Sequence, residues 1–309
     1  MVLPAVGKGA RSVKPGFNPA TEQPSLIYSA TMFGRISLWV IAHPLIAYFG
    51  LAYAISWIIV LPLVAYAQGF LEVPIPFALH YLNDYAPLLA AIIVTGIASG
   101  TDGIRELFRR MIRLNVGFAW VLVAAFSPLV LFGITAGITV FAMGGAPPDL
   151  GLLGELPYLP YLGLSGWIFW LLTVGLGEES GWRGYALPKL QADMSAISAT
   201  LIVTLFWVLW HLPRFFYFDG FLDQGFSVLP LFALQQLLLA ILLTWLYNSG
   251  RGSILAAALF HSGFNFFLAS PADVGEMAVV IRGLLIVWVI AVIVAFKPTN
   301  LSAKGRHTV

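Results

Sequence analysis

The chain contains no cysteine, and only 10% of its 309 residues are charged. The absence of cysteine excludes disulfides, thiolate metal sites and a cysteine nucleophile. A formal net charge of +2 is too small to indicate a nucleic-acid partner. The first residues also lack an apolar core beside a cleavage site, so they do not resemble a signal peptide. Their Pro, Gly and basic side chains predict instead a disordered cytoplasmic tail over residues 1–35.

Apolar residues, by contrast, are abundant, since 60% of the chain is hydrophobic and the mean hydropathy is +0.89. Lipid admits only helices or closed barrels as spanning structures, and a spanning helix needs about 20 apolar residues. We therefore predict an all-α, polytopic membrane helix bundle of about eight transmembrane helices within a single domain, residues 36–297. Residues 298–309 would form a cytoplasmic C-terminal tail. The predicted spans are 45–67, 81–99, 118–143, 162–177 and onward, 196–211 and onward, 229–247, 254–268 and 277–296.

The basic residues orient these spans. Of the sixteen Lys and Arg residues, all except Arg214 and Arg282 fall on the side that holds both termini. The positive-inside rule then predicts a multi-pass protein of the cell membrane with both termini in the cytoplasm. The opposite loops would carry acidic residues, among them Glu72, Asp84 and Asp149. Membrane lipid is an expected partner, and the cluster Arg105–Arg113 should contact anionic headgroups.

Two adjacent acids, Glu178 and Glu179, stand at the end of an apolar run and are followed by Arg183. A charge at the centre of a bilayer costs roughly 2.5–3.5 kcal/mol, so these carboxylates must be paired or solvated by an internal cavity. Glu179 and Arg183 are four residues apart and can pair on one helix face. Glu178 points about 100° away and lacks a partner on its own helix. This interpretation requires the fourth helix to continue to about Leu190.

Two later helices supply further polar groups. His211 lies at the end of the predicted fifth span, and His261 and Asn265 share one face of the seventh. With Glu178, three helices could bring a carboxylate, two imidazoles and an amide to a similar depth. This set permits peptide hydrolysis, because an acid and a histidine can activate water while the remaining donors stabilise an oxyanion. We expect the cleft to open toward the cytoplasm, where the basic side could attract an anionic substrate.

Three motifs in this order resemble those of the CPBP family, which contains type II CAAX prenyl endopeptidases and bacteriocin-processing or immunity proteins. The motifs are Glu178-Glu179-x-x-x-Arg183, Trp207-x-x-x-His211 and His261-x-x-x-Asn265. The resemblance covers the motif core 162–268. One position departs from the pattern, because the second motif usually begins with Phe where this chain has Trp207. An aromatic side chain is retained there, so we expect no functional consequence.

The resemblance implies a glutamic intramembrane endopeptidase that needs no cofactor and acts on peptide or protein substrates, some of them membrane-anchored. It implies that Glu178 and His211 activate the water. His261 and Asn265 would form the oxyanion hole, and the neighbouring acid–arginine pair would shape the site.

Other mechanisms use the same residues. Glu178, His211 and His261 could bind zinc, although the helical H-E-x-x-H pattern is missing. A serine protease could use Ser180 or Ser262, but the G-x-S-x-G elbow is absent. An aspartyl protease is disfavoured because we expect no Asp within a span. A non-catalytic membrane scaffold or bacteriocin-immunity protein stays open, as does a transporter, which the lack of repeats disfavours.

Overall fold

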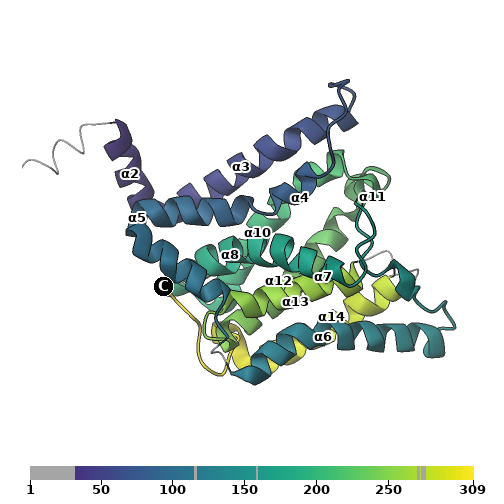
Figure 1. The fold of residues 1–309 in the computed structure, drawn as a ribbon. Coiled ribbons are helices and arrows are strands. Elements are labelled where there is room, and N and C mark those ends of the chain that lie inside the picture. The colour runs from purple at the N-terminus through teal and green to yellow at the C-terminus, as the bar shows by residue number, and fades with distance from the viewer. Residues whose placement is uncertain (1–31, 115–116, 158, 270–271, 273–275) are drawn as a thin grey trace, which may run out of the picture.

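The structure, a computed structural model, describes residues 32–114, 117–157, 159–269, 272 and 276–309. These residues form helices and connecting loops, with no β-strand among them (Figure 1). The predicted all-α fold is therefore confirmed. Most of the predicted N-terminal tail, residues 1–31, lies outside the described residues. The last residues of that segment, 32–35, belong to the helix α2 (Met32–Ala42).

Six helical segments are long and apolar enough to cross a membrane, and each corresponds to a predicted span. The protein is thus a multi-pass membrane protein. Its principal helices are α3 (Pro44–Ala67), α4 (Leu79–Asn83), α5 (Ala86–Met111), α6 (Phe118–Gly137), α10 (Ala196–Trp210), α12 (Leu229–Ser249), α13 (Ile254–Leu268) and α14 (Met277–Asn300). With 15 residues, α13 is too short for that criterion, but its bounds are those predicted for the seventh span.

The acid-motif helix is the run of helical turns from Ser165 to Asp193. It comprises α7 (Ser165–Trp170), the π-helical η3 (Leu171–Glu178), α8 (Glu179–Gly181), the π-helical η4 (Trp182–Ala186) and α9 (Leu187–Asp193). The predicted continuation to about Leu190 is confirmed, because helix extends through that residue. Glu178 and Glu179 therefore lie inside a helix. The flanking π-helical turns are of a kind that is frequent at functional sites.

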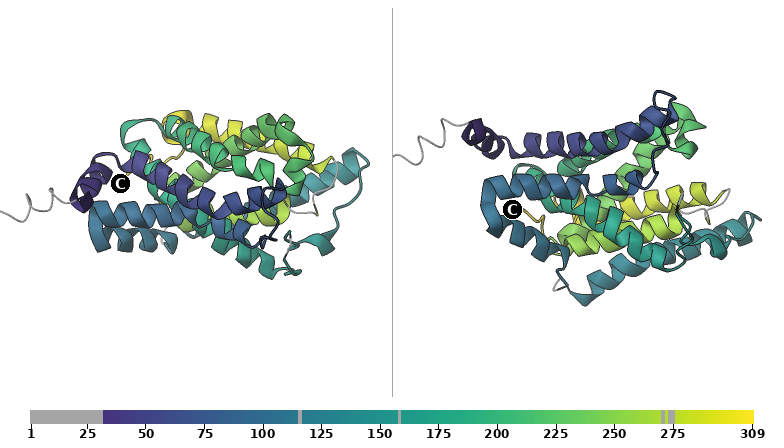
Figure 2. Two further views of the ribbon diagram at one scale, coloured as in Figure 1. Left: turned by 90° about the horizontal axis from the view of Figure 1, so that it is seen from above. Right: turned by 45° about the horizontal axis from the view of Figure 1, so that its top comes forward.

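The acid-motif helix lies at the centre of the bundle. Helix α3 packs on α5, α5 on the acid-motif helix, that helix on α13, and α13 on α6 (Figures 1 and 2). Helix α12 packs against α10, α13 and α14. The acid motif is therefore buried on several sides. Its charged side chains lie at mid-bundle, so they need partners from other groups of the protein.

The bundle has two chemically different ends. At the basic end, Arg113 Nη1 donates to the carbonyl of Arg251 at 2.9 Å, and Lys304 Nζ donates to the carbonyl of Ser249 at 3.1 Å. These bonds join the connection after α5, the turn after α12 and the C-terminal tail. At the far end, the Tyr81 hydroxyl donates to the carbonyl of Pro157 at 2.9 Å. We use the name far end for the end of the bundle opposite the basic one, which consists of α4 and the connections around residues 143–164 and 211–228.

Candidate active site

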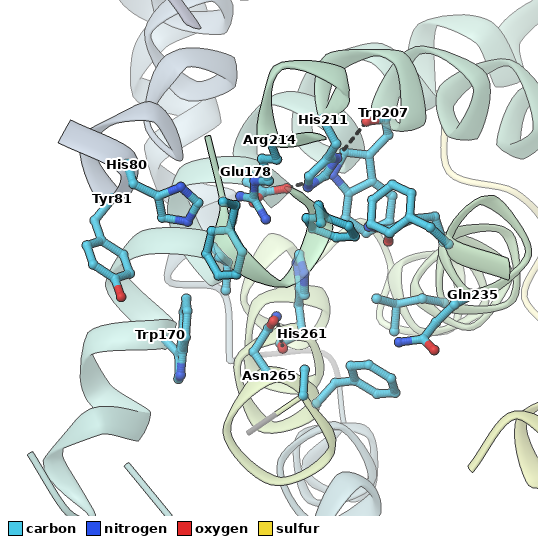
Figure 3. A pocket seen from close by; sticks show the side chains of 18 of the residues that line it. His80, Tyr81, Trp170, Glu178, Trp207, His211, Arg214, Gln235, His261 and Asn265 are labelled. Carbon is cyan, nitrogen blue, oxygen red and sulfur yellow. Dashed lines mark hydrogen bonds between the residues drawn. The ribbon is translucent and has the colours of Figure 1, made fainter. Parts of the chain in front are cut away.

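A cavity of about 280 Å³ lies beside the acid-motif helix (Figure 3). Glu178, His211, His261 and Asn265 all line it. They come from η3, from the end of α10 and from α13, so the structure brings together the four residues that the motifs predict as catalytic. The cavity wall also includes aromatic and amide side chains, among them Trp170, Phe232, Gln235 and Gln236.

Glu178 is 1% exposed and receives a hydrogen bond from a different helix. The indole N–H of Trp207, on α10, donates to its Oε2 at 2.7 Å (Figure 3). The motif predicts Trp207 as a supporting residue of the site, with an aromatic ring in place of phenylalanine, but it does not predict this bond. The residue type itself was a signal for such a bond, because tryptophan carries a hydrogen-bond donor that phenylalanine lacks. Trp207 therefore holds the carboxylate that the motif predicts as the base.

The tautomer of His211 follows from its partner. Its Nδ1 lies 2.7 Å from the backbone carbonyl oxygen of Trp207. A carbonyl oxygen can only accept, so Nδ1 must be the donor. In the neutral ring, Nε2 then carries the lone pair. His211 is buried, and its ring is held between those of Trp210 and Phe232, with centroids 4.8 and 5.4 Å away.

The predicted ion pair between Glu179 and Arg183 is present. Arg183 Nη1 lies 3.0 Å from Glu179 Oε1, and both side chains are fully buried. The same oxygen is 2.9 Å from Nδ1 of His261, so Glu179 joins Arg183 to the third motif. The Arg183 guanidinium also lies 4.7 Å above the ring centroid of Trp207. The supporting residues thus fix the orientation of residues that line the cavity.

Asn265 occupies the cavity wall one helical turn beyond His261 (Figure 3). Its Nδ2 donates to the backbone carbonyl of His261 at 3.1 Å. An amide nitrogen carries two hydrogens, so this bond leaves one donor for another acceptor.

Two charged residues at the far end contradict the sequence interpretation. The sequence predicts Asp84 in a loop and Arg214 on the side away from the termini, but Asp84 is 0% exposed and lies in the candidate span Leu79–Met111. Its Oδ1 is 3.4 Å from Nη2 of Arg214, which also lines the cavity. Contrary to the expectation from the sequence, an aspartate therefore lies within a candidate span. Asp84 can be buried because Arg214 partners it, and this pairing between distant segments has no local sequence signal.

The direction of the cleft also differs from expectation. We predicted an opening on the side that holds the basic residues. Instead, the residues that line the cavity include His80 and Tyr81 of α4, Pro157, and Phe218 and Phe221. All of these belong to the far end. The prediction failed because the depth of a residue along its helix does not reveal which end of the helix is covered by its neighbours.

The zinc alternative needs three converging ligands. Among the residues that the structure describes, no group of three or more His, Cys, Asp or Glu side chains is arranged to hold a metal ion. The set Glu178, His211 and His261 therefore does not fit a zinc site in this arrangement.

Comparison with known proteins supports the motif assignment. The sequence model of the type II CAAX prenyl endopeptidase Rce1-like family matches residues 160–267. That segment contains all three motifs, so the predicted family resemblance is confirmed over the motif core. A relative from Methanococcus maripaludis named CAAX prenyl protease 2 is 30% identical over 142 residues, which cover 45% of this chain. The match spans 52% of that relative, or about half of its length.

Proposed function

We propose that this protein is an intramembrane endopeptidase that hydrolyses peptide bonds of membrane-associated substrates. The observation that carries the proposal is the meeting of Glu178, His211, His261 and Asn265 on one cavity inside the bundle. The resemblance of residues 160–267 to Rce1-like endopeptidases supports it. Hydrolysis needs a base that activates a water and donors that stabilise an oxyanion, and these side chains can supply both the base and the donors.

In the proposed mechanism, Glu178 and His211 activate a water. The lone pair on Nε2 of His211 accepts one hydrogen bond from the water, and the Glu178 carboxylate takes a proton as the water oxygen attacks the peptide carbonyl carbon. Collapse of the tetrahedral intermediate breaks the C–N bond, and the proton held by Glu178 passes to the departing amine. Trp207 fixes the carboxylate throughout, because its N–H bonds Oε2.

His261 and Asn265 stabilise the developing oxyanion in this proposal. Nδ1 of His261 bonds Glu179, which fixes the ring, and Nε2 is the ring nitrogen that this proposal assigns to the oxyanion. Asn265 adds its remaining amide hydrogen. Loss of one oxyanion donor in other hydrolases costs about 10²–10³ in kcat, so each of these two groups could contribute substantially.

We propose peptides or proteins held at the membrane as substrates, because the cavity lies inside a membrane bundle. The relative from M. maripaludis is named a prenyl protease, which makes a prenylated peptide the first synthetic substrate to test. An unprenylated peptide of the same sequence is the matched control. We also retain the orientation predicted from the basic residues, with both termini in the cytoplasm.

The decisive experiment compares membranes that contain the wild-type protein with membranes that contain Glu178→Gln. New peptide termini are identified by mass spectrometry, with and without a chelator. We expect termini that disappear in Glu178→Gln and persist under chelation, because the amide cannot take the proton. Glu72→Gln is the matched control, since Glu72 is an exposed acid outside the cavity.

The other outcomes point to other functions. Termini that disappear on chelation would indicate a metal-dependent protease instead. If Glu178→Gln is folded and equally expressed but the termini are unchanged, the protein is not a glutamate-dependent protease. The scaffold or immunity function would then be favoured.

A further inference from the structure

We propose that a second pocket, at the basic end of the bundle, binds a phosphate group. This pocket has a volume of about 160 Å³ and is formed by α5, the acid-motif helix and Val309 of the C-terminal tail, and we call it the α5 pocket. The proposal goes beyond a general contact of basic residues with headgroups, because it assigns a bounded site. It does not depend on the proposed function. The lining residues that carry it are Thr95, Ser99, Glu106, Arg110 and Lys189.

A bend in α5 forms one wall of the α5 pocket (Figure 1). It lies at Gly100, whose φ of 62° and ψ of −157° are a conformation that is essentially restricted to glycine. The two halves of α5 approach closely, since a Cβ atom added at Gly103 would lie 2.8 Å from Cγ2 of Thr95. Beyond the bend, Gly103, Glu106 and Arg110 share one helix face, and all three line the pocket. The bend therefore turns the arginine-bearing half of α5 toward the acid-motif helix.

Arg110 is a buried cation with a donor to spare. Its side chain is 6% exposed, and its Nη1 donates to the Tyr247 hydroxyl at 3.1 Å. Its Nε lies 3.9 Å from Oε1 of Glu106, which is beyond hydrogen-bond distance. Among the described residues, this Nε has no hydrogen-bond partner. A buried donor without an acceptor is costly, and an anion in the pocket would supply the acceptor.

Lys189 contributes a second cation, from the acid-motif helix. Its ammonium lies 5.1 Å from the ring centroid of Tyr185, and within the described part of the chain it has no carboxylate partner. Glu106 is the acidic side chain of the wall, and it already pairs with Arg109 and Arg113. Positive side-chain charge around the α5 pocket therefore exceeds negative side-chain charge, which favours an anionic ligand.

A phosphate group matches the donors that surround the α5 pocket. Guanidinium and ammonium groups both bind phosphate oxygens, and the hydroxyls of Thr95 and Ser99 can donate to further oxygens. The cavity is about five times the volume that one water molecule occupies in the liquid. It therefore has room for one phosphate group.

The phosphate could belong to a phospholipid headgroup or be free in solution, and the surroundings favour the lipid. Phe108 and Ile112, on the same half of α5, are 45% and 73% exposed. Exposed apolar side chains beside arginines are typical of a helix that lies in the headgroup region. Gly184, the neighbour of Arg183 in the chain, also lines the pocket. A bound headgroup would thus link α5 to the acid-motif helix and should stabilise the folded protein.

Thermal unfolding of the full chain, purified in dodecyl maltoside, tests the site. The lipid probe is dioleoylphosphatidylglycerol, and dioleoylglycerol is its match without phosphate. Sodium phosphate, compared with sodium chloride at equal ionic strength, tests the free anion. Lys189→Gln removes one cation, and Ser99→Asp adds a negative charge at an exposed position of the wall. Lys297→Gln is the matched control, because Lys297 is an exposed lysine outside the pocket.

The quantity compared is the change in unfolding midpoint that each probe causes, so a variant with altered basal stability remains informative. We expect dioleoylphosphatidylglycerol, but not dioleoylglycerol, to raise the midpoints of wild type and Lys297→Gln. Lys189→Gln and Ser99→Asp should each need about tenfold more lipid for the same rise, because a charge-assisted bond is lost or a repulsion is added.

The two anion sources give different results. A rise with sodium phosphate alone that is weakened in Lys189→Gln and Ser99→Asp would assign the α5 pocket to free phosphate. A rise with the phospholipid, with or without a response to sodium phosphate, would assign it to the headgroup. No rise with either probe in wild type, or an equal rise in all four proteins, would overturn the proposal.

Discussion

At the residue scale, the bond between Trp207 and Glu178 is the most specific feature of the site. The indole ring carries a buried donor to the carboxylate that the motifs predict as the base. Its ring also packs under the Arg183 guanidinium and 5.3 Å from the ring of His261, edge to face. One side chain therefore contacts all three motifs, and its hydrogen bond is the part that phenylalanine could not reproduce.

We predict that Trp207→Phe lowers kcat about tenfold while KM changes little. A hydrogen bond to a charged group is worth roughly 1.5–3 kcal/mol, and about 1.4 kcal/mol corresponds to a factor of ten in rate. The measurement is steady-state cleavage of a peptide substrate by the purified protein. Trp245→Phe is the control, because Trp245 is buried on α12 outside the cavity and its Nε1 has no partner among the described residues. Unchanged kcat in Trp207→Phe would show that the bond does not position the base.

Several candidate site residues were predictable from the sequence because they stand at a helical spacing from a partner. Glu179 and Arg183 are four residues apart, and so are His261 and Asn265. The pairing of Asp84 with Arg214 was not predictable, because it joins residues 130 positions apart. Spacing rules describe neighbours on one helix, whereas contacts between helices depend on how the bundle packs.

At the element scale, the acid-motif helix approaches α5 through a glycine. A Cβ atom added at Gly181 would lie 2.6 Å from the backbone oxygen of Pro87 and would also overlap the Tyr48 hydroxyl. Backbone cannot move aside as a flexible side chain can. The close packing that buries Glu179 and Arg183 therefore requires the absence of a side chain at this position.

We predict that Gly181→Ala destabilises the protein by about 3 kcal/mol, at the upper end of the usual cost of overpacking. The readout is the thermal unfolding midpoint of the detergent-purified protein. Gly133→Ala on α6 is the control, since an added Cβ there meets nothing within 4 Å. That variant should be neutral or slightly stabilised, because alanine favours helix by roughly 0.5–1 kcal/mol over glycine. Equal midpoints for the two variants would contradict this account of the packing.

The lengths of the elements were largely readable from hydropathy, because a bilayer imposes a minimum apolar length on each span. The bounds of α13 and the continuation of helix past Glu178 agree with prediction. The π-helical turns of η3 and η4 were not foreseen. The segment η3 packs against α13 and α5, and η4 packs against α5, but no residue pattern in the sequence specifies a π-helical turn there.

At the scale of the whole molecule, the C-terminal tail closes the basic end. The backbone N–H of His307 donates to Asn248 Oδ1 at 3.1 Å, and Gln191 Nε2 donates to the carbonyl of His307 at 2.8 Å. Partial burial lowers the pKa of His307 below its usual 6.5, and the nearby Arg110 and Arg113 lower it further, while Glu106 opposes them. The tail is thus docked with a neutral imidazole.

We predict that the protein loses stability as the pH falls below about 6.5. The unfolded chain binds a proton at His307 near its usual pKa, whereas the folded chain resists protonation, so the unfolded state gains protons first. This contribution is complete above pH 6.5 and is lost as the pH falls toward the lowered folded value. Thermal unfolding of wild type and His307→Asn between pH 5 and 8 measures it. His43→Asn, at an exposed histidine, is the control.

The comparison of wild type with His307→Asn separates the contribution of His307 to the pH dependence of stability from that of the histidines inside the bundle. We expect the midpoint of His307→Asn to fall less steeply with acid than that of wild type, while His43→Asn follows wild type. Parallel curves for all three proteins would show that docking of the tail does not depend on the charge of His307.

The sequence by itself predicted that this protein lies in a membrane, six of its spanning segments and the residues of the candidate site. Apolar length dictates helices in lipid, and helical spacing brings each motif onto one face. Only the tertiary structure decided that Trp207 bonds Glu178, that Asp84 lies buried against Arg214, and that the cleft ends away from the basic residues. These features depend on which helices are neighbours and which ends they cover. Hydropathy cannot report this, because a lipid-facing and a protein-facing side chain are equally apolar.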